Sequence, residues 1–237
     1  MATPPSSHGR GAPKLETMLT QIYEISSTQE AAAISAMGVD HIGVLVGDGR
    51  FPREQSPASA FAIAASIAPP AKFSALFLSP DIAFIARVCR ELQPAIVHLG
   101  SAPGLVTPEQ VRQLKRSISG ILVMRSVPVL GAESIDIALD YEGIADFLLL
   151  DSYRAADEQI GALGVTHDWS ISRQIVARVR TPVILAGGLG PDNVAEAIRI
   201  VGPAGVDTKT KTDKGTTHTK DLQKVELFER AAKQAQA

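Results

Sequence analysis

The feature that most constrains this chain is a repeated alternation of short, β-rich apolar runs with helical patterns. Eight such pairs follow Leu19 in a chain of 237 residues. Strands joined by crossover helices must run parallel, and eight pairs close most naturally into a barrel. We therefore predict an α/β fold, one (β/α)₈ TIM barrel over residues 17–237. The predicted strands are 19–25, 41–46, 73–78, 95–99, 120–126, 145–150, 182–186 and 204–208.

Helix-start patterns support this alternation. Ser27 and Thr107 each precede a Glu or Gln by three residues, the spacing of a capping box, and Pro191-Asp192-Asn193 stands before Val194. An open doubly wound sheet is the alternative fold. The Gly-x-Gly-x-x-Gly sequence that often follows the first strand of such a sheet is not present.

The first residues, the net charge and the apolar runs limit the classes of protein to which this chain can belong. Residues 1–16 are rich in Pro, Gly and Ser without an apolar period, which predicts a disordered tail. The formal net charge of −2 gives no general electrostatic reason to bind nucleic acid or a membrane surface. No apolar run approaches the ~20 residues of a membrane span, so we expect a cytoplasmic protein.

Cys89 lies on an apolar helical face, and we expect a buried, unreactive thiol.

A candidate phosphate-binding loop lies in residues 181–194. An apolar run ends in Gly187-Gly188, and Pro191 then begins a helical pattern. Glycines let backbone N–H groups approach an oxyanion, and the following helix adds its own unpaired N–H donors. This pattern predicts a phosphate site, with a tight turn that holds no ligand as the alternative.

Barrel enzymes carry their chemistry at the carboxyl ends of the strands. Asp151 is the most informative residue there, because Phe147 to Leu150 carry a carboxyl directly from a buried run to the barrel mouth. Its alternative interpretation is a helix cap or a loop carboxylate. Other polar residues at predicted strand ends are Gln21, Tyr23, Glu24, Asp48, Arg50, Arg53, His98, Arg125 and the segment 207–211.

Four segments, in order, resemble the phosphoribosylanthranilate isomerase family. They are 38–43 (GVDHIG), 149–152 (LLDS), 161–169 (GALGVTHDW) and 185–194 (LAGGLGPDNV). The resemblance covers nearly everything after Leu19. It implies a (β/α)₈ barrel, a phosphorylated ribose derivative as substrate and an Amadori rearrangement in tryptophan biosynthesis.

The resemblance also implies roles for individual residues. That chemistry needs an acid for the furanose ring oxygen and a base for the C2′ proton. Asp151 matches the family's general acid, and Arg53 matches the arginine that holds the anthranilate carboxylate. Gly187 and Gly188 match half of the phosphate site, and Gly164 closes a glycine-containing loop expected at the substrate.

The chain departs from the family at its first, fourth and eighth strands. Tyr23 stands where the family has its cysteine base, and ionising a tyrosine at pH 7 costs roughly 4 kcal/mol. His98 replaces a glutamine and could take the missing proton, while Arg125 ends the fifth strand. Lys209-Thr210-Lys211 replaces Ser-Ser-Gly at the phosphate site, where a solvated basic loop is the alternative.

The expected ligand is a phosphorylated small molecule, bound without a cofactor or metal by a monomer or homodimer. Three functions remain open. The first is the family's isomerisation, with Asp151 and Tyr23 as catalytic residues. The second is a carbon–carbon lyase in which Lys209 forms a Schiff base with a phosphosugar. The third is a non-catalytic paralogue that binds a phosphorylated metabolite.

Overall fold

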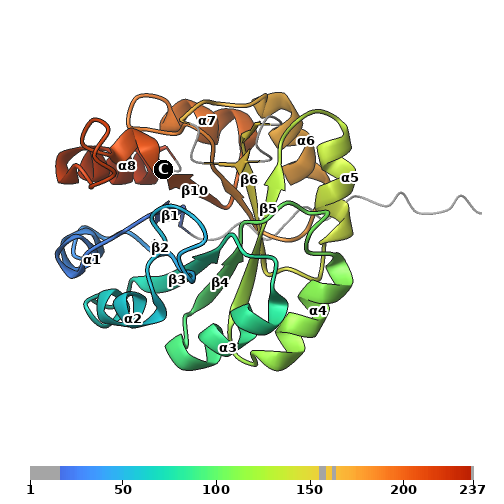
Figure 1. Ribbon diagram of the computed structural model, residues 1–237. Helices are drawn as coiled ribbons and strands as arrows, with labels where there is room; N and C mark the ends of the chain where they lie inside the picture. The colour runs from blue at the N-terminus through green and yellow to red at the C-terminus, as the bar shows by residue number, and fades with distance from the viewer. Residues whose placement is uncertain (1–16, 155–158, 162–163, 236–237) are drawn as a thin grey trace, which may run out of the picture.

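The computed structural model describes residues 17–154, 159–161 and 164–235. The tail expected at residues 1–16 lies outside this part. Eight parallel strands form a closed barrel in the order β1-β10-β9-β6-β5-β4-β3-β2, with helices arranged round it (Figure 1). The barrel strands are β1 (Leu19–Ile22), β2 (His41–Leu45), β3 (Lys72–Phe77), β4 (Ile96–Leu99), β5 (Leu122–Pro128), β6 (Phe147–Asp151), β9 (Val183–Leu185) and β10 (Gly205–Thr208).

Each predicted strand is present, so the predicted (β/α)₈ fold is confirmed. The helices that connect the strands are α1 (Thr28–Ser35), α2 (Pro57–Ala65), α3 (Ile82–Leu92), α4 (Pro108–Ser117), α5 (Glu133–Asp140), α6 (Trp169–Arg178), α7 (Val194–Val201) and α8 (Leu222–Gln234). A 3₁₀ turn, η1 (Thr210–Thr212), follows β10. A short antiparallel pair, β7 (Tyr153–Arg154) and β8 (Gln159–Ile160), was not predicted.

The three helices begin where the start patterns predict, but only two are capped by a side chain. The Ser27 hydroxyl accepts the Glu30 N–H at α1, and Thr107 and Gln110 form a full capping box at α4. Asn193 does not cap α7 with its side chain. Its amide instead accepts from Gly190 N–H at 2.8 Å and donates to the Gly188 carbonyl at 3.2 Å. It therefore stabilises the preceding glycine loop.

Side chains alternate between two apolar regions. The larger core lies between the barrel and the helices, and a smaller one fills the barrel interior with Tyr23, Ile96, Met124, Leu149, Ile184 and Ala186. Because neighbouring strand residues face opposite sides, every second residue of a strand points into the barrel. No helix in the described ranges is long and apolar enough to cross a membrane.

Candidate active site

A pocket opens at the barrel mouth, the end where the carboxyl ends of the strands meet. It is formed by the end of β6, the loops that follow β6 and β9, and the end of β10. The lining residues are Asp151, Gly164, Gly187, Gly188, Leu189, Asp207, Thr208, Lys209, Thr210 and Lys211. Seven of these were candidate site residues from the sequence: Asp151, Gly164, Gly187, Gly188, Lys209, Thr210 and Lys211. This is the position at which (β/α)₈ barrels carry their active sites.

Asp151 is the last residue of β6 and stays partly open to this pocket. Its Oδ1 accepts the Ser152 N–H at 2.7 Å and the Ser152 hydroxyl at 3.3 Å. Gly161 passes so close that a Cβ there would overlap Asp151 Oδ2. Burial by these neighbours outweighs the Ser152 hydrogen bonds and raises the pKa of Asp151 to about 7. A carboxyl with such a pKa can donate a proton at neutral pH.

Asp207 on β10 is a second carboxyl in the same pocket, 7 % exposed. It accepts from Gln21 Nε2 at 3.1 Å, and Gln21 Oε1 lies 3.2 Å from His41 Nδ1. Burial and the charge of Asp151 raise the pKa of Asp207 to about 8. The sequence placed Asp207 at a strand end but offered no reason to select it, because its proximity to Asp151 depends on how β6 and β10 pair with β9.

The paired glycines let two loops approach each other. Gly187 and Gly188 have φ values of +83° and +62°, which residues other than glycine rarely adopt. A Cβ at Gly188 would lie 2.6 Å from the Val165 carbonyl carbon, and one at Gly187 would lie 2.8 Å from His167 Nδ1. The Thr208 hydroxyl donates to the Leu189 carbonyl at 2.6 Å and joins the glycine loop to β10. The glycines are thus required by packing as well as suited to an oxyanion.

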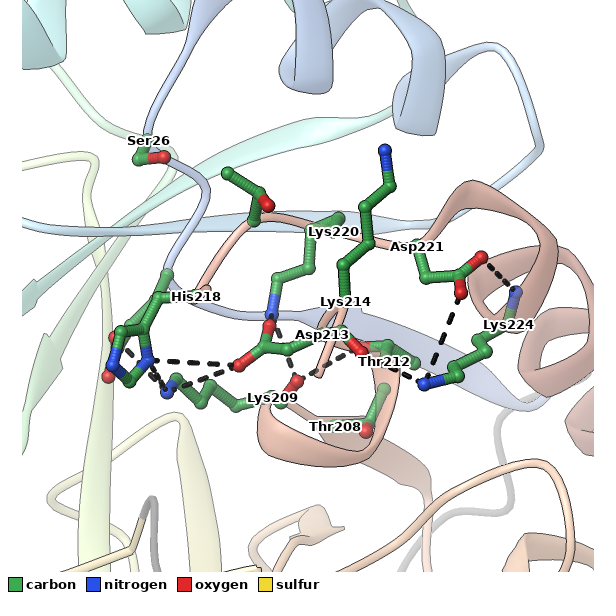
Figure 2. A network of polar contacts seen from close by, with 12 residues as sticks. Ser26, Thr208, Lys209, Thr212, Asp213, Lys214, His218, Lys220, Asp221 and Lys224 are labelled. Carbon is green, nitrogen blue, oxygen red and sulfur yellow. Dashed lines mark hydrogen bonds and ion pairs between the residues drawn. The ribbon is translucent and has the colours of Figure 1, made fainter. Parts of the chain in front are cut away.

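The segment after β10 carries a polar network (Figure 2). Lys209 and Lys220 both point toward the buried carboxylate of Asp213, with Nζ–O distances of 3.4 and 2.6 Å. Lys220 Nζ also donates to the Lys209 carbonyl at 3.0 Å, which fixes the backbone at the pocket edge. Lys209 Nζ lies 3.5 Å from Glu24 and 3.1 Å from His218 Nδ1. Lys209 is therefore held by two carboxylates, whereas Lys211 is exposed and lies against Gly190.

Arg53 is occupied by a carboxylate of the chain itself. Its Nε and Nη2 donate to Glu24 at 2.6 and 3.1 Å, a bidentate pair. Both residues have positive φ, +68° for Arg53 and +59° for Glu24. The hydrogen bond from Arg53 and the charge of Lys209 outweigh burial and lower the pKa of Glu24. The guanidinium expected to bind a substrate carboxylate thus already holds one.

Tyr23 and His98 lie deeper, inside the barrel. The Tyr23 hydroxyl is 2.7 Å from Ser74 Oγ and 2.8 Å from His98 Nδ1, and His98 Nε2 is 2.7 Å from Ser126 Oγ. A Cβ at Gly43 would overlap the Tyr23 ring. Burial raises the pKa of Tyr23 and lowers that of His98 to about 3. The geometry therefore favours a neutral packing role for both, rather than proton transfer.

Arg125 does not join the other candidates. It follows Met124, which faces the barrel interior, and so points toward the helices. Its Nη1 donates to the carbonyls of Leu99 and Ser101, each at 2.7 Å, and its guanidinium lies over the Tyr141 ring. It is fully buried and ties β5 to the loop after β4.

Two further predictions concern reactive groups. Cys89 is buried, as expected, and burial raises the pKa of its thiol to about 12, which disfavours the reactive thiolate. Within the described ranges, no group of three or more His, Cys, Asp or Glu is arranged to hold a metal ion.

The fold and the pocket define a class: a (β/α)₈ barrel protein with a carboxyl of near-neutral pKa beside a glycine-rich loop at the strand ends. Comparison with known proteins gives the family. Residues 21–231 match the model of the N-(5′-phosphoribosyl)anthranilate (PRA) isomerase family, and the chain belongs to that family.

Individual PRA isomerases are similar to this chain over most of its length. The PRA isomerase of Methanocella arvoryzae is 35 % identical over 210 residues, 88 % of this chain and 94 % of the relative. The crystal structure of the Thermotoga maritima enzyme is 25 % identical, with a TM-score of 0.78, over 92 % of this chain and 99 % of that chain. A PRA isomerase crystallised with reduced 1-(o-carboxyphenylamino)-1-deoxyribulose 5-phosphate is 24 % identical over the same shares, with a TM-score of 0.75, and supports the fold.

Proposed function

We propose that this protein catalyses the Amadori rearrangement of N-(5′-phosphoribosyl)anthranilate, an aldose–ketose isomerisation in tryptophan biosynthesis. One observation carries the proposal. In a chain of the PRA isomerase family, a single pocket joins the protonatable carboxyl of Asp151 to the glycine loop at Gly187 and Gly188. The reaction needs both features, because the ring oxygen must be protonated while the phosphate holds the sugar in place.

The proposed roles follow from the pocket. Asp151 is the general acid that protonates the furanose oxygen as the ring opens. The substrate phosphate binds between the N–H groups at Gly187 and Gly188 and the segment 209–211, with Gly164 closing the pocket from the loop after β6. The basic side chain of Lys211, exposed at the pocket edge, adds charge to that phosphate site. The partner is a phosphorylated small molecule, bound by a monomer or a homodimer.

The test is turnover of N-(5′-phosphoribosyl)anthranilate by the purified protein, with rescue of a tryptophan auxotroph that lacks this isomerase. We expect the wild type to form the ketose product and Asp151→Asn to lose at least ~100-fold in kcat, the usual contribution of a general acid. Asp48→Asn, an exposed carboxylate paired with Arg50, is the matched control and should keep wild-type activity. A wild type without turnover or rescue would refute the isomerase function.

A non-catalytic binding protein is the second candidate, and two observations favour it. Tyr23 is fixed between Ser74 and His98 where the family has its cysteine base, and Glu24 occupies Arg53. Tyr23→Cys separates the two candidates. If the wild type binds the reduced product analogue without turnover and Tyr23→Cys gains activity, the protein is a binding paralogue whose barrel has lost its base.

The lyase alternative predicts a covalent bond at Lys209. Its ammonium would first have to give up its ion pairs with Glu24 and Asp213. Borohydride reduction in the presence of ribose 5-phosphate, followed by a peptide map, tests it. Label on Lys209 would support a Schiff base, and unlabelled Lys209 would exclude the lyase.

A further inference from the structure

Asp151 and Asp207 stand level with each other on the two strands that flank β9. Leu150 of β6 and Val206 of β10 both pair with Leu185 of β9. One residue further on, the two aspartates therefore lie on either side of Ala186. Strands spaced ~4.8 Å apart put their Cα atoms roughly 10 Å from each other. The small side chain between them leaves room for reacting atoms.

Each aspartate is held on its outer side and turned toward the pocket. Ser152 donates to Asp151, and Gln21 donates to Asp207 from the next strand, β1. Both carboxyls line the pocket that contains the glycine loop. A ligand with its phosphate at Gly187 and Gly188 would thus carry its sugar between two carboxyl groups. One proton shared by such a pair supplies an acid and a base together.

The other candidates for a base are engaged elsewhere. Tyr23 and His98 hydrogen-bond to each other inside the barrel and do not line the pocket. Glu24 is committed to Arg53, and Lys209 to two carboxylates. Among the residues that line the pocket, Asp207 is the carboxylate left once Asp151 acts as the acid.

We propose that Asp207 is the catalytic base that removes the C2′ proton of the substrate, facing Asp151 across Ala186. The assignment rests on the isomerase function proposed above. It gives this chain a base at the eighth barrel strand, in place of one at the first. In the free protein, burial and the charge of Asp151 raise the pKa of Asp207 to about 8, above the value of about 7 for Asp151, so a proton shared by the pair rests on Asp207. The assigned roles therefore require substrate binding to shift this proton to Asp151.

The proton transfers balance without an oxidant or a cofactor. Asp151 gives its proton to the ring oxygen as the C1′–O bond breaks, which leaves an iminium between the nitrogen and C1′. The Asp207 carboxylate takes the C2′ proton, and the C–H electron pair forms the C1′–C2′ double bond while the iminium π pair returns to nitrogen. The C2′ hydroxyl proton then passes to Asp151, and Asp207 delivers a proton to C1′. Both groups end as they began, with the ketose formed.

The experiment compares wild type, Asp207→Asn and Asp207→Ala with N-(5′-phosphoribosyl)anthranilate. The asparagine keeps an oxygen that can accept the Gln21 hydrogen bond, so the pocket is disturbed little. We expect kcat to fall at least ~100-fold in both variants, with formate restoring at least tenfold in Asp207→Ala because it supplies the missing carboxylate. Affinity for reduced 1-(o-carboxyphenylamino)-1-deoxyribulose 5-phosphate should stay within about threefold of wild type.

The outcomes separate the two proposals. Active wild type with an Asp207→Asn variant that keeps kcat within threefold refutes the base and leaves the isomerase function standing. Loss of kcat together with loss of analogue binding, and no effect of formate, also refutes the base, because Asp207 then only shapes the pocket. A wild type without turnover refutes the isomerase function and the base with it.

Discussion

At the scale of single residues, the contact between Glu24 and Arg53 governs which ligand the mouth can accept. The Glu24 carboxylate accepts from Nε and Nη2 of the Arg53 guanidinium, in a bidentate geometry that a substrate carboxylate would also use. Glu24 does this from a left-handed backbone conformation that non-glycine residues rarely adopt. The ion pair therefore competes with an anthranilate carboxylate for this edge of the guanidinium.

Removing that competitor should tighten binding. We expect Glu24→Gln to bind reduced 1-(o-carboxyphenylamino)-1-deoxyribulose 5-phosphate more tightly than wild type by about tenfold, since a freed charge-assisted bond contributes about 1.5 kcal/mol. Isothermal titration calorimetry measures it, and ribose 5-phosphate, which lacks the carboxylate, is the control ligand and should show no gain. Equal or weaker binding of the carboxylate ligand would show that Arg53 serves only the ion pair.

At the scale of elements, the repeat of strand and helix could be predicted because each unit carries its own local pattern. Each buried run gave a strand, and the capping box at Thr107 and Gln110 formed as expected. The short pair β7–β8 could not be predicted, because two-residue strands have no periodicity to detect. Asn193 matched a helix-cap pattern, yet its side chain bonds back to Gly188 and Gly190.

The side chain of Asn193 leads to a prediction about the glycine loop. Asn193→Ala removes two hydrogen bonds that hold the loop, so we expect affinity for ribose 5-phosphate to fall by about thirtyfold, as roughly 1 kcal/mol for each bond implies. Thr107→Ala is the matched control: it removes a cap on α4 and should lower stability by ~1 kcal/mol without changing that affinity. An Asn193→Ala variant with unchanged affinity would show that the loop holds its shape without this side chain.

At the scale of the whole molecule, the order and register of the barrel strands decide which polar residues meet. Barrel enzymes carry their chemistry at the carboxyl ends of the strands, and this rule selected Asp151, the glycine pair and the 209–211 segment. They line one pocket because all of them end β6, β9 or β10 or lie just beyond those strands. The same rule could not separate Arg125 from them, since a one-residue difference in register turns a side chain from the pocket to the helices. It also could not select Asp207, whose pairing with Asp151 arises only after strands 56 residues apart become near neighbours.

The raised pKa values of Asp151 and Asp207 also make the stability of the folded protein depend on pH. An aspartate whose pKa is raised in the folded state binds its proton more tightly there than in the unfolded chain. Its contribution is therefore present at low pH and lost as pH rises through the folded pKa, about 7 for Asp151 and about 8 for Asp207. Buried histidines act oppositely, because the pKa of His41 is lowered to about 4 and that of His98 to about 3, but their effect ends near pH 6.5.

The carboxyl pair should then dominate between pH 6.5 and 8.5, with a smaller fall in stability from the buried Cys89 thiol, whose pKa is also raised. We expect the free energy of unfolding to fall by about 2 kcal/mol between pH 6.5 and 8.5, and Asp207→Asn to reduce the fall to under about 1 kcal/mol and to be more stable than wild type at pH 8.5. Urea unfolding at fixed salt measures both, with Asp48→Asn as the surface control. If the free energy of unfolding of the wild type stays constant or rises across that window, the pKa values of the two carboxyls are not raised in the folded protein.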